Sequence, residues 1–262
     1  MTDSITFDRA ANYYDETRGF PPGVEQPVGE MVAKAGGFTR DSKVLEVGIG
    51  TGRVGLPVSA HVQGYYGIDV SIPMMQRLRQ KQTTEPVYLA QADATRLPFP
   101  DHSFDGAVSV HVFHLIPTWQ QALQEVKRIL KPGAQLLNCW NSDHDRDPRI
   151  TQMWDAWNAT IPVEDNQRVG ARADETPDFI DKEGWQPQGE IVFHTFAYTF
   201  TVARHLEHLR HRVWSRLWGM RDEDIEAGIA AVEAVASQLF EDDHEPAVLG
   251  NRFNVQAYRP NA

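Results

Sequence analysis

The sequence is poor in cysteine, in long apolar runs and in clustered positive charge. Its 262 residues include one cysteine, Cys139, which cannot form an intramolecular disulfide and is typical of a reducing compartment. No run of about 18 apolar residues occurs, and residues 1–15 lack the apolar centre of a signal peptide. We therefore expect a cytoplasmic location and no membrane as partner.

The charge balance disfavours nucleic acid as a partner. Asp and Glu outnumber Lys and Arg by 36 to 25, so the formal net charge is −11, and no basic run occurs. Binding along a phosphate backbone requires a basic face. The hydrophobic share of 41% is ordinary for a globular protein and allows a sizeable core. Nothing in the composition specifies an oligomeric state.

Strands and helices alternate along residues 38–141. The expected strands cover 43–47, 63–68, 87–91, 104–110 and 134–140, and the expected helices cover 52–60, 71–82 and 119–130. The Lys-Pro-Gly sequence at 131–133 is expected to stop the last of these helices. Such alternation predicts an α/β fold, a doubly wound and mostly parallel sheet with helices on both faces.

After residue 141 the pattern changes. We expect helices at 149–160, 177–183, 203–218 and 222–240, and strands at 190–201 and 248–258. The chain is interpreted as one domain, 1–262, with an N-terminal cap segment at 1–37 and a cofactor-binding core at 38–141. Helical insertions are expected at 142–189 and 202–247, and the second lies between the last two strands.

Tryptophan is concentrated in the second half of the chain. Six of the seven tryptophans lie at or beyond Trp140. They are interpreted either as packing residues for the helices or as the lining of a substrate lid over a small, partly apolar acceptor. The two interpretations are compatible, because a lid also needs a packed interior.

The most informative segment is 44–52, Val-Leu-Glu-Val-Gly-Ile-Gly-Thr-Gly. A buried strand, a glycine-rich turn and a helix start form the crevice in which α/β sheets bind nucleotide-like ligands. The glycines at 48, 50 and 52 permit a tight turn, a close approach of the ligand and close helix packing. Arg53 stands where a dinucleotide pattern has its last glycine, which favours a ligand other than NAD.

Three acidic residues end the first three expected strands: Glu46, Asp69 and Asp93. Asp69 follows Gly50 at about the 20-residue offset of a carboxylate that holds a ribose diol, and Asp93 could accept from the amino group of an adenine. Each acid alone would be read as a loop cap. Together, at successive strand ends, they favour a common site.

These segments, with Gly67-Ile68-Asp69, Gln91–Ala94, Leu97-Pro98-Phe99, Phe104-Asp105 and Arg128–Gly133, resemble the class I S-adenosylmethionine-dependent methyltransferases of the UbiE/type 11 group. The resemblance covers about residues 40–141. It implies a Rossmann-like seven-stranded sheet whose last strand is antiparallel, and S-adenosylmethionine as cofactor. The residues it assigns to that cofactor are Glu46, Gly48 and Gly50 at the methionine part, with Thr51 and Gly52 in the same turn, Asp69 at the ribose, Asp93 and Ala94 at the adenine, Val110 beside the sulfonium, and Tyr14 and Arg18 in a segment that closes over it.

The predicted function is methyl transfer by in-line displacement to a small, partly apolar or aromatic acceptor. His114 and His111 are the candidate bases, because histidine titrates near neutral pH; both can also be ordinary loop or core histidines. His205, His208 and His211 lack the spacing of a zinc site and are expected on a solvated helix face, so no metal is predicted.

Three alternatives remain open from the sequence. A non-catalytic S-adenosylmethionine-binding protein would bind the cofactor without transferring its methyl group. A nicotinamide-dependent oxidoreductase shares the strand–glycine–helix pattern, but Arg53 counts against it. RNA methylation is disfavoured by the negative charge.

Overall fold

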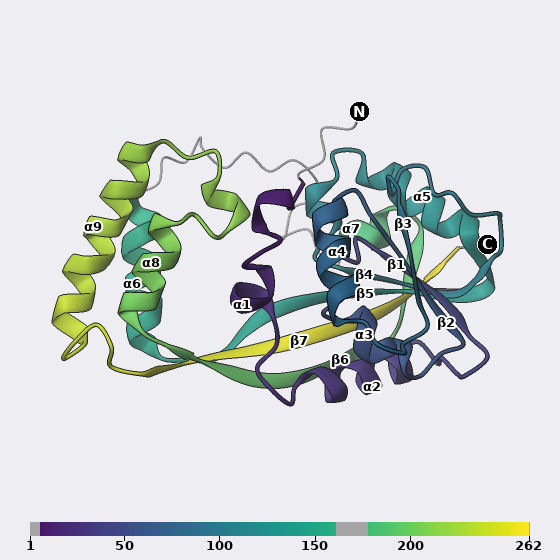
Figure 1. Ribbon diagram of the computed structural model, residues 1–262, viewed down its shortest axis with the longest axis horizontal. Helices are drawn as coiled ribbons and strands as arrows, with labels where there is room; N and C mark the ends of the chain where they lie inside the picture. Colours follow the sequence, from purple (N-terminus) through teal and green to yellow (C-terminus); the bar gives the residue numbers. More distant parts are fainter. Residues whose placement is uncertain (1–5, 161–177, 262) are drawn as a thin grey trace. The chain divides into compact units, whose positions relative to one another are not determined.

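The computed structural model describes residues 6–160 and 178–261, and Figure 1 shows their arrangement. Seven strands form one sheet in the order β3-β2-β1-β4-β5-β7-β6. Their bounds are β1 Lys43–Val47, β2 Gly64–Asp69, β3 Val87–Gln91, β4 Phe104–Val110, β5 Leu130–Arg146, β6 Trp185–Phe200 and β7 Ala247–Pro260.

The sheet is mostly parallel. Parallel pairing joins β2 to β1 and β3, and β4 to β1 and β5. The last strand, β7, runs against β5: Asp147 N donates to Val248 O, while Asn254 further along β7 reaches Trp140 O further back in β5. The α/β, doubly wound, seven-stranded fold with an antiparallel last strand is therefore confirmed.

The chain divides into two compact units. Of the described residues, the first unit comprises 6–141, 178–194 and 253–261, and the second comprises 142–160 and 195–252. The helices of the first unit are η1 Asp8–Ala10, α1 Tyr14–Arg18, α2 Glu25–Ala35, α3 Gly55–Ser59, α4 Ile72–Lys81, η2 Phe113–Leu115, α5 Trp119–Ile129 and α7 Asp178–Lys182.

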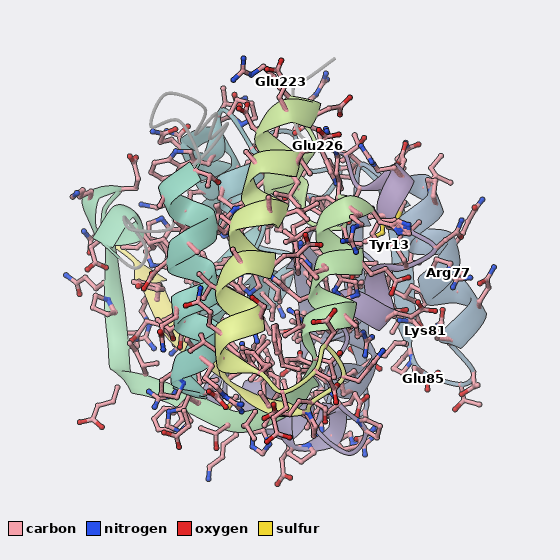
Figure 2. All side chains as sticks on the ribbon, turned by 90° about the vertical axis from the view of Figure 1, so that its left-hand side faces the viewer. Tyr13, Arg77, Lys81, Glu85, Glu223 and Glu226 are labelled. Atoms are coloured by element: carbon pink, nitrogen blue, oxygen red, sulfur yellow. The ribbon has the colours of Figure 1, made fainter. Side chains whose placement is uncertain are left out.

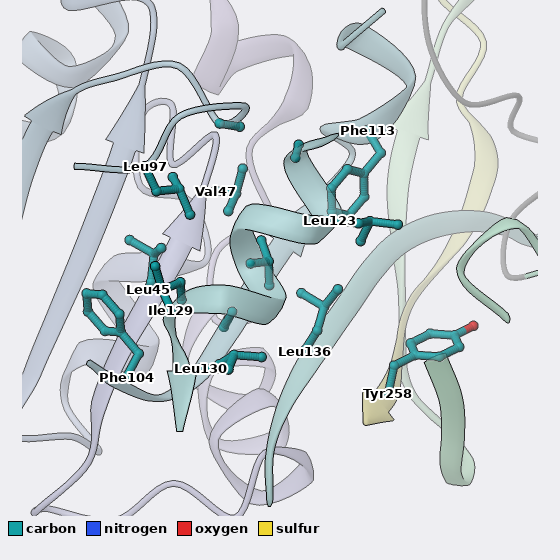
Figure 3. Close-up of a cluster of buried hydrophobic side chains, with 14 of the residues drawn as sticks. Leu45, Val47, Leu97, Phe104, Phe113, Leu123, Ile129, Leu130, Leu136 and Tyr258 are labelled. Atoms are coloured by element: carbon teal, nitrogen blue, oxygen red, sulfur yellow. The ribbon is translucent and has the colours of Figure 1, made fainter. Parts of the chain in front are cut away.

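The core of the first unit forms between the parallel strands and α5 (Figure 3). Leu45 of β1, Leu123 and Ile129 of α5, and Leu136 of β5 are at most 1% exposed. Burial of each such side chain contributes about 1.5–3 kcal/mol relative to exposure. Because strands of a parallel sheet are covered on both faces, an acidic residue within β1 is buried whichever face it is on.

Helix α4 begins as its sequence predicts. The Ser71 hydroxyl accepts a hydrogen bond from Met74 N at 3.3 Å, and Pro73 stands in the first turn, where its missing N–H costs nothing. Figure 2 shows Arg77 and Lys81 on the outward side of this helix. By contrast, the helix expected at 52–60 begins only at Gly55, because the preceding residues belong to the glycine turn.

The second unit consists of helices together with parts of β5, β6 and β7. Its helices are α6 Pro148–Thr160, α8 Val202–Arg210, η5 Ser215–Leu217 and α9 Asp222–Leu239. They share a core that includes Ile150, Met153, Leu206 and Val232. Asp222, Glu223 and Asp224 lie in the first turn of α9, where acidic side chains interact favourably with the helix dipole; Glu223 is labelled in Figure 2.

Two expected boundaries are wrong. The helix expected at 203–218 ends at Arg210, because the chain turns at Arg212 with φ +51°. Two hydrogen bonds with residues later in the chain stabilise this turn. The Arg212 guanidinium donates to Met220 O at 2.7 Å, and Trp218 Nε1 donates to Arg212 O at 2.8 Å. Strand β5 runs from Leu130 through 131–133 to Arg146, so Lys-Pro-Gly does not separate helix from strand.

Other elements agree within a few residues. The helix expected at 177–183 is seen as Asp178–Lys182, with residue 177 outside the described residues, and β6 begins at Trp185 rather than 190. No helix in residues 6–160 or 178–261 combines the length and the apolar character needed to cross a membrane.

Candidate functional site

The turn after β1 depends on glycine. Gly48, Gly50 and Gly52 have φ of +70°, +55° and +76°. Residues with a side chain rarely adopt this backbone region. The turn is anchored to β2, since Gly48 N and Ile49 N both donate to Ile68 O, at 2.9 and 3.0 Å. A Cβ atom at position 48 would lie 2.5 Å from the Val112 side chain. Position 48 therefore admits only glycine without rearrangement.

Asp69, at the end of β2, closes this turn. Its Oδ2 accepts from Gly50 N at 2.8 Å and its Oδ1 accepts from Ser71 N at 2.8 Å. Burial raises the pKa of Asp69, while the two amide donors act in the opposite direction. The carboxylate thus joins the ends of β1 and β2 at the edge of the sheet where α/β folds bind ligands.

Glu46 is a buried acid inside β1. Its side chain is 2% exposed, and its Oε2 accepts a hydrogen bond from the Tyr65 hydroxyl at 2.9 Å. Burial raises the pKa of Glu46 to about 8, although Tyr65 and the charge of Arg53 favour the carboxylate. Tyr65 escaped the sequence prediction, because a tyrosine in a buried strand is ordinary for a β-strand.

A small cavity of about 30 Å³ opens at the turn. It brings together six of the residues predicted for the cofactor: Tyr14, Glu46, Gly48, Gly50, Thr51 and Val110. It also includes three that were not predicted: Ile49, Arg53 and Val54.

Residues 14–18, which form α1, contact the glycine turn and its neighbours through polar groups. Asp15 accepts from the Thr51 hydroxyl at 2.6 Å and forms an ion pair with Lys81 at 2.8 Å. The Arg53 guanidinium donates to the carbonyl of Arg18 at 2.7 Å. Arg18 contributes its backbone carbonyl to this contact, and Tyr14 is one of the residues that line the cavity.

Five residues predicted for the cofactor lie outside the lining of this cavity: Arg18 and Asp69, described above, and Gly52, Asp93 and Ala94. Asp93 Oδ1 accepts from Thr95 N at 2.9 Å and from the Thr95 hydroxyl at 2.8 Å, so it caps its own loop. Ala94 is 5% exposed and belongs to the apolar core. A Cβ atom on Gly52 would lie 2.6 Å from Leu78, so this glycine permits close helix packing.

The two candidate bases differ in environment. His111 has φ +49°, and Asn141 engages its Nε2 through both the backbone N, at 2.8 Å, and the side-chain Oδ1, at 3.0 Å. Burial and the nearby charge of Arg53 lower the pKa of His111 to about 3. His114 is exposed on η2, with its ring centre 6.4 Å from that of His111. This geometry favours His114 for proton transfer.

The histidines of α8 correct one expectation. His205 is only 7% exposed and stacks on Trp154, with ring centres 6.1 Å apart and an interplanar angle of 19°. The solvated face predicted for His205 is therefore wrong, because α8 packs this edge into the second unit, while His211 is exposed. Across the described ranges, no group of three or more His, Cys, Asp or Glu is arranged to hold a metal ion.

Comparison with known proteins places the site within a matched region. Residues 45–138 match a family model described as a methyltransferase domain. A phosphatidylethanolamine N-methyltransferase of Cereibacter sphaeroides is 35% identical over 42% of this chain and 55% of that protein. A demethylmenaquinone methyltransferase of Lactiplantibacillus plantarum is 32% identical over 44% of this chain and 51% of that protein. The chain thus spans about half the length of these curated relatives.

The fold extends over most of the chain in solved structures. A phosphoethanolamine N-methyltransferase 2 of Haemonchus contortus, in complex with phosphomonomethylethanolamine and S-adenosylhomocysteine, superposes with a TM-score of 0.54 and 16% identity. The superposition covers 97% of this chain and 58% of that one.

Proposed function

This chain carries a methyltransferase domain of the UbiE/type 11 group, within the class I S-adenosylmethionine-dependent methyltransferases, and on that premise we propose that it transfers a methyl group to a small acceptor with an apolar or aromatic body. The observation that carries the proposal is the positive-φ turn at Gly48 and Gly50, fixed to the end of β2 by the Asp69 carboxylate. Such a turn leaves backbone accessible where a cofactor needs to approach closely.

The residues present fit this cofactor. The glycines keep the turn free of side chains, and Glu46 supplies an acid at the cavity. We assign Asp69 to the ribose hydroxyls, since each oxygen of an ionised carboxylate can accept a further hydrogen bond beside the one from Gly50 N or Ser71 N. Val110, which lines the cavity, is assigned to the neighbourhood of the sulfonium, and Asp93 and Ala94 are assigned to the adenine.

The reaction needs few chemical groups from the protein itself. Bound S-adenosylmethionine supplies an activated methyl group, so the chain has to align the acceptor for in-line displacement and exclude water. Where the acceptor atom carries a proton, His114 is the group proposed to remove it, since it is exposed and His111 is engaged by Asn141.

The acceptor class rests on two considerations. The relatives above are named for phosphatidylethanolamine and demethylmenaquinone, two molecules with large apolar parts. The second unit is rich in aromatic side chains, and we propose that it acts as a substrate lid. The net charge of −11 disfavours RNA as the acceptor.

The test is transfer of label from methyl-tritiated S-adenosylmethionine to a panel of quinols, phenols, amines and fatty acids. We expect label in at least one organic product, with equal release of S-adenosylhomocysteine. His114→Ala should lower the turnover number without changing the affinity for S-adenosylhomocysteine. Cofactor binding without transfer to any acceptor would favour the non-catalytic alternative, and binding of NADH instead would overturn the proposal.

A further inference from the structure

Strand β6 lies at one edge of the sheet. It ends the order β3-β2-β1-β4-β5-β7-β6, so on its outer side no other strand of residues 6–160 and 178–261 pairs with it. Proteins usually protect such an edge with lysine, proline or a bulge, because an open edge can pair with another chain. Residues 190–200 of β6 contain neither lysine nor proline.

Three consecutive apolar side chains are exposed in this part of β6. Ile191 is 41%, Val192 is 40% and Phe193 is 51% exposed. Successive residues of a strand project to opposite faces, so Val192 lies on one face and the other two lie on the opposite face. A strand added at this edge would therefore cover apolar surface on both faces of the sheet.

This segment is complementary to itself in the antiparallel direction. When Val192 faces Val192 of a second copy, Ile191 of each copy faces Phe193 of the other. In the same register Glu190 faces His194, whose ring can donate an N–H to the carboxylate in either protonation state. Apolar side chains thus face apolar ones, an acid faces a donor, and no like charges face each other.

We propose that β6 pairs antiparallel with β6 of a second copy of this chain, across a two-fold axis at Val192. A two-fold interface uses the same surface on both copies, which is the condition that this self-complementary segment meets. Gly189, with φ +67°, interrupts the extended backbone before the segment. It would face Thr195 of the second copy, so regular pairing covers residues 190–194. The inference does not depend on the proposed function.

The short paired segment limits the expected affinity. Pairing over residues 190–194 should bury less than the about 800 Å² per partner of a stable interface. The net charge of −11 on each copy also opposes association. We therefore expect a dissociation constant above about 1 μM. Association should strengthen with added salt, which screens the repulsion between the copies.

The first experiment is sedimentation of the full chain from about 1 μM to about 500 μM, a range that brackets weak association. Val192→Lys places like charges opposite each other at the two-fold axis, so it should weaken the dimer about tenfold or more. Val248→Lys is the matched control, because Val248 is 55% exposed on β7, outside the paired segment. It should leave association unchanged.

A charge exchange tests the register. Glu190→Lys removes the carboxylate that faces His194, and the two-fold axis repeats this loss, so the dimer should weaken about tenfold. Adding His194→Glu to the same chain places opposite charges across the axis again. The double variant should therefore recover the association of wild type within about threefold.

Val192→Cys detects the two-fold axis directly. Residues opposite each other in an antiparallel pair have Cα atoms about 4.5–5.5 Å apart, within the range of a disulfide. Oxidation with copper phenanthroline should link two copies through this position, whereas the native Cys139, 1% exposed, should not react. Thr195→Cys is the control, because in this register its two equivalents lie about 20 Å apart.

Three outcomes overturn the inference. One is a wild type that stays monomeric at about 500 μM, which would leave the edge to a different partner. The others are an equal weakening by Val192→Lys and Val248→Lys, and equal cross-linking of Val192→Cys and Thr195→Cys. None of these measurements uses S-adenosylmethionine, so their failure is distinct from a failure of the proposed function.

Discussion

The two units of this chain use their most constrained residues for different purposes. In the first unit, two positive-φ glycines and the buried acid Glu46 line a cavity, and Tyr65 donates a hydrogen bond to Glu46 Oε2. In the second unit, the constrained contacts are between side chains: the guanidiniums of Arg146 and Arg216 lie 4.6 and 5.4 Å from the ring centre of Trp154, which also stacks on His205. We interpret the constrained residues of the first unit as parts of a binding site and those of the second unit as residues that stabilise helix packing.

The largest expected effect comes from adding one methyl group to a constrained glycine in each unit. At Gly48 the new Cβ would lie 2.5 Å from Val112, with φ +70°, and at Gly228 of α9 it would lie 2.5 Å from Trp157. We expect Gly48→Ala to abolish detectable binding of S-adenosylhomocysteine. Gly228→Ala should leave binding intact and destabilise the second unit by about 1–3 kcal/mol through overpacking.

Calorimetry with S-adenosylhomocysteine measures the first effect, and hydrogen exchange of α6 and α9 measures the second. Hydrogen exchange is preferred to a single melting curve because the two units need not unfold together. If Gly48→Ala bound normally, or if Gly228→Ala lost binding without faster exchange, the assignment of roles to the two units would be wrong.

The first unit was largely predictable because its signals are local. Alternating strands and helices, three glycines within five residues and an acid at a strand end each restrict the chain over a few positions. The missing parts are tertiary. Tyr65 could be paired with Glu46 only once the β1–β2 register was known, and the Asn141 amide that engages His111 comes from another strand.

The second unit was less predictable for the same reason. Residues 203–218 contain no glycine or proline, so the helical pattern continued through the point where the chain turns at Arg212. That turn is set by hydrogen bonds to Met220 and Trp218, which the sequence does not bring together. His205 appeared polar among arginines, yet its packing against Trp154 buries it.

A pH titration sharpens the comparison, since each unit holds a buried titratable group of opposite sign. Burial lowers the pKa of His205 to about 4, below its unfolded value, so the unfolded state binds more protons between these values. Its contribution to stability is full above about pH 6.5 and falls by up to about 3 kcal/mol towards pH 4. The raised pKa of Glu46 acts in the opposite direction, lowering stability as the pH rises from about 4.5 to 8.

His205→Phe keeps an aromatic ring and removes the titration, and His211→Phe, at an exposed position of the same region, is the control. The protection of the α8 amides, which is the exchange rate corrected for the pH dependence of intrinsic exchange, should fall below about pH 6.5 in wild type and in the control but much less in His205→Phe. The same acid dependence in all three proteins would show that His205 does not report on the second unit.

The smallest expected effects come from two polar networks, one in each unit. Asp69 holds two backbone amides at the turn, whereas Arg149 joins Asp147 and Glu245 in the second unit, at 2.9 and 2.6 Å. Asp69→Asn should weaken binding of S-adenosylhomocysteine about tenfold, since the amide side chain keeps an acceptor but loses the charge. Arg149→Gln should leave binding unchanged and reduce the stability of the second unit only slightly, because its ion pairs are partly exposed. Calorimetry measures binding and hydrogen exchange measures stability in both variants. A loss of binding in Arg149→Gln, or a loss of stability without a loss of binding in Asp69→Asn, would show that the two networks do not have these separate roles.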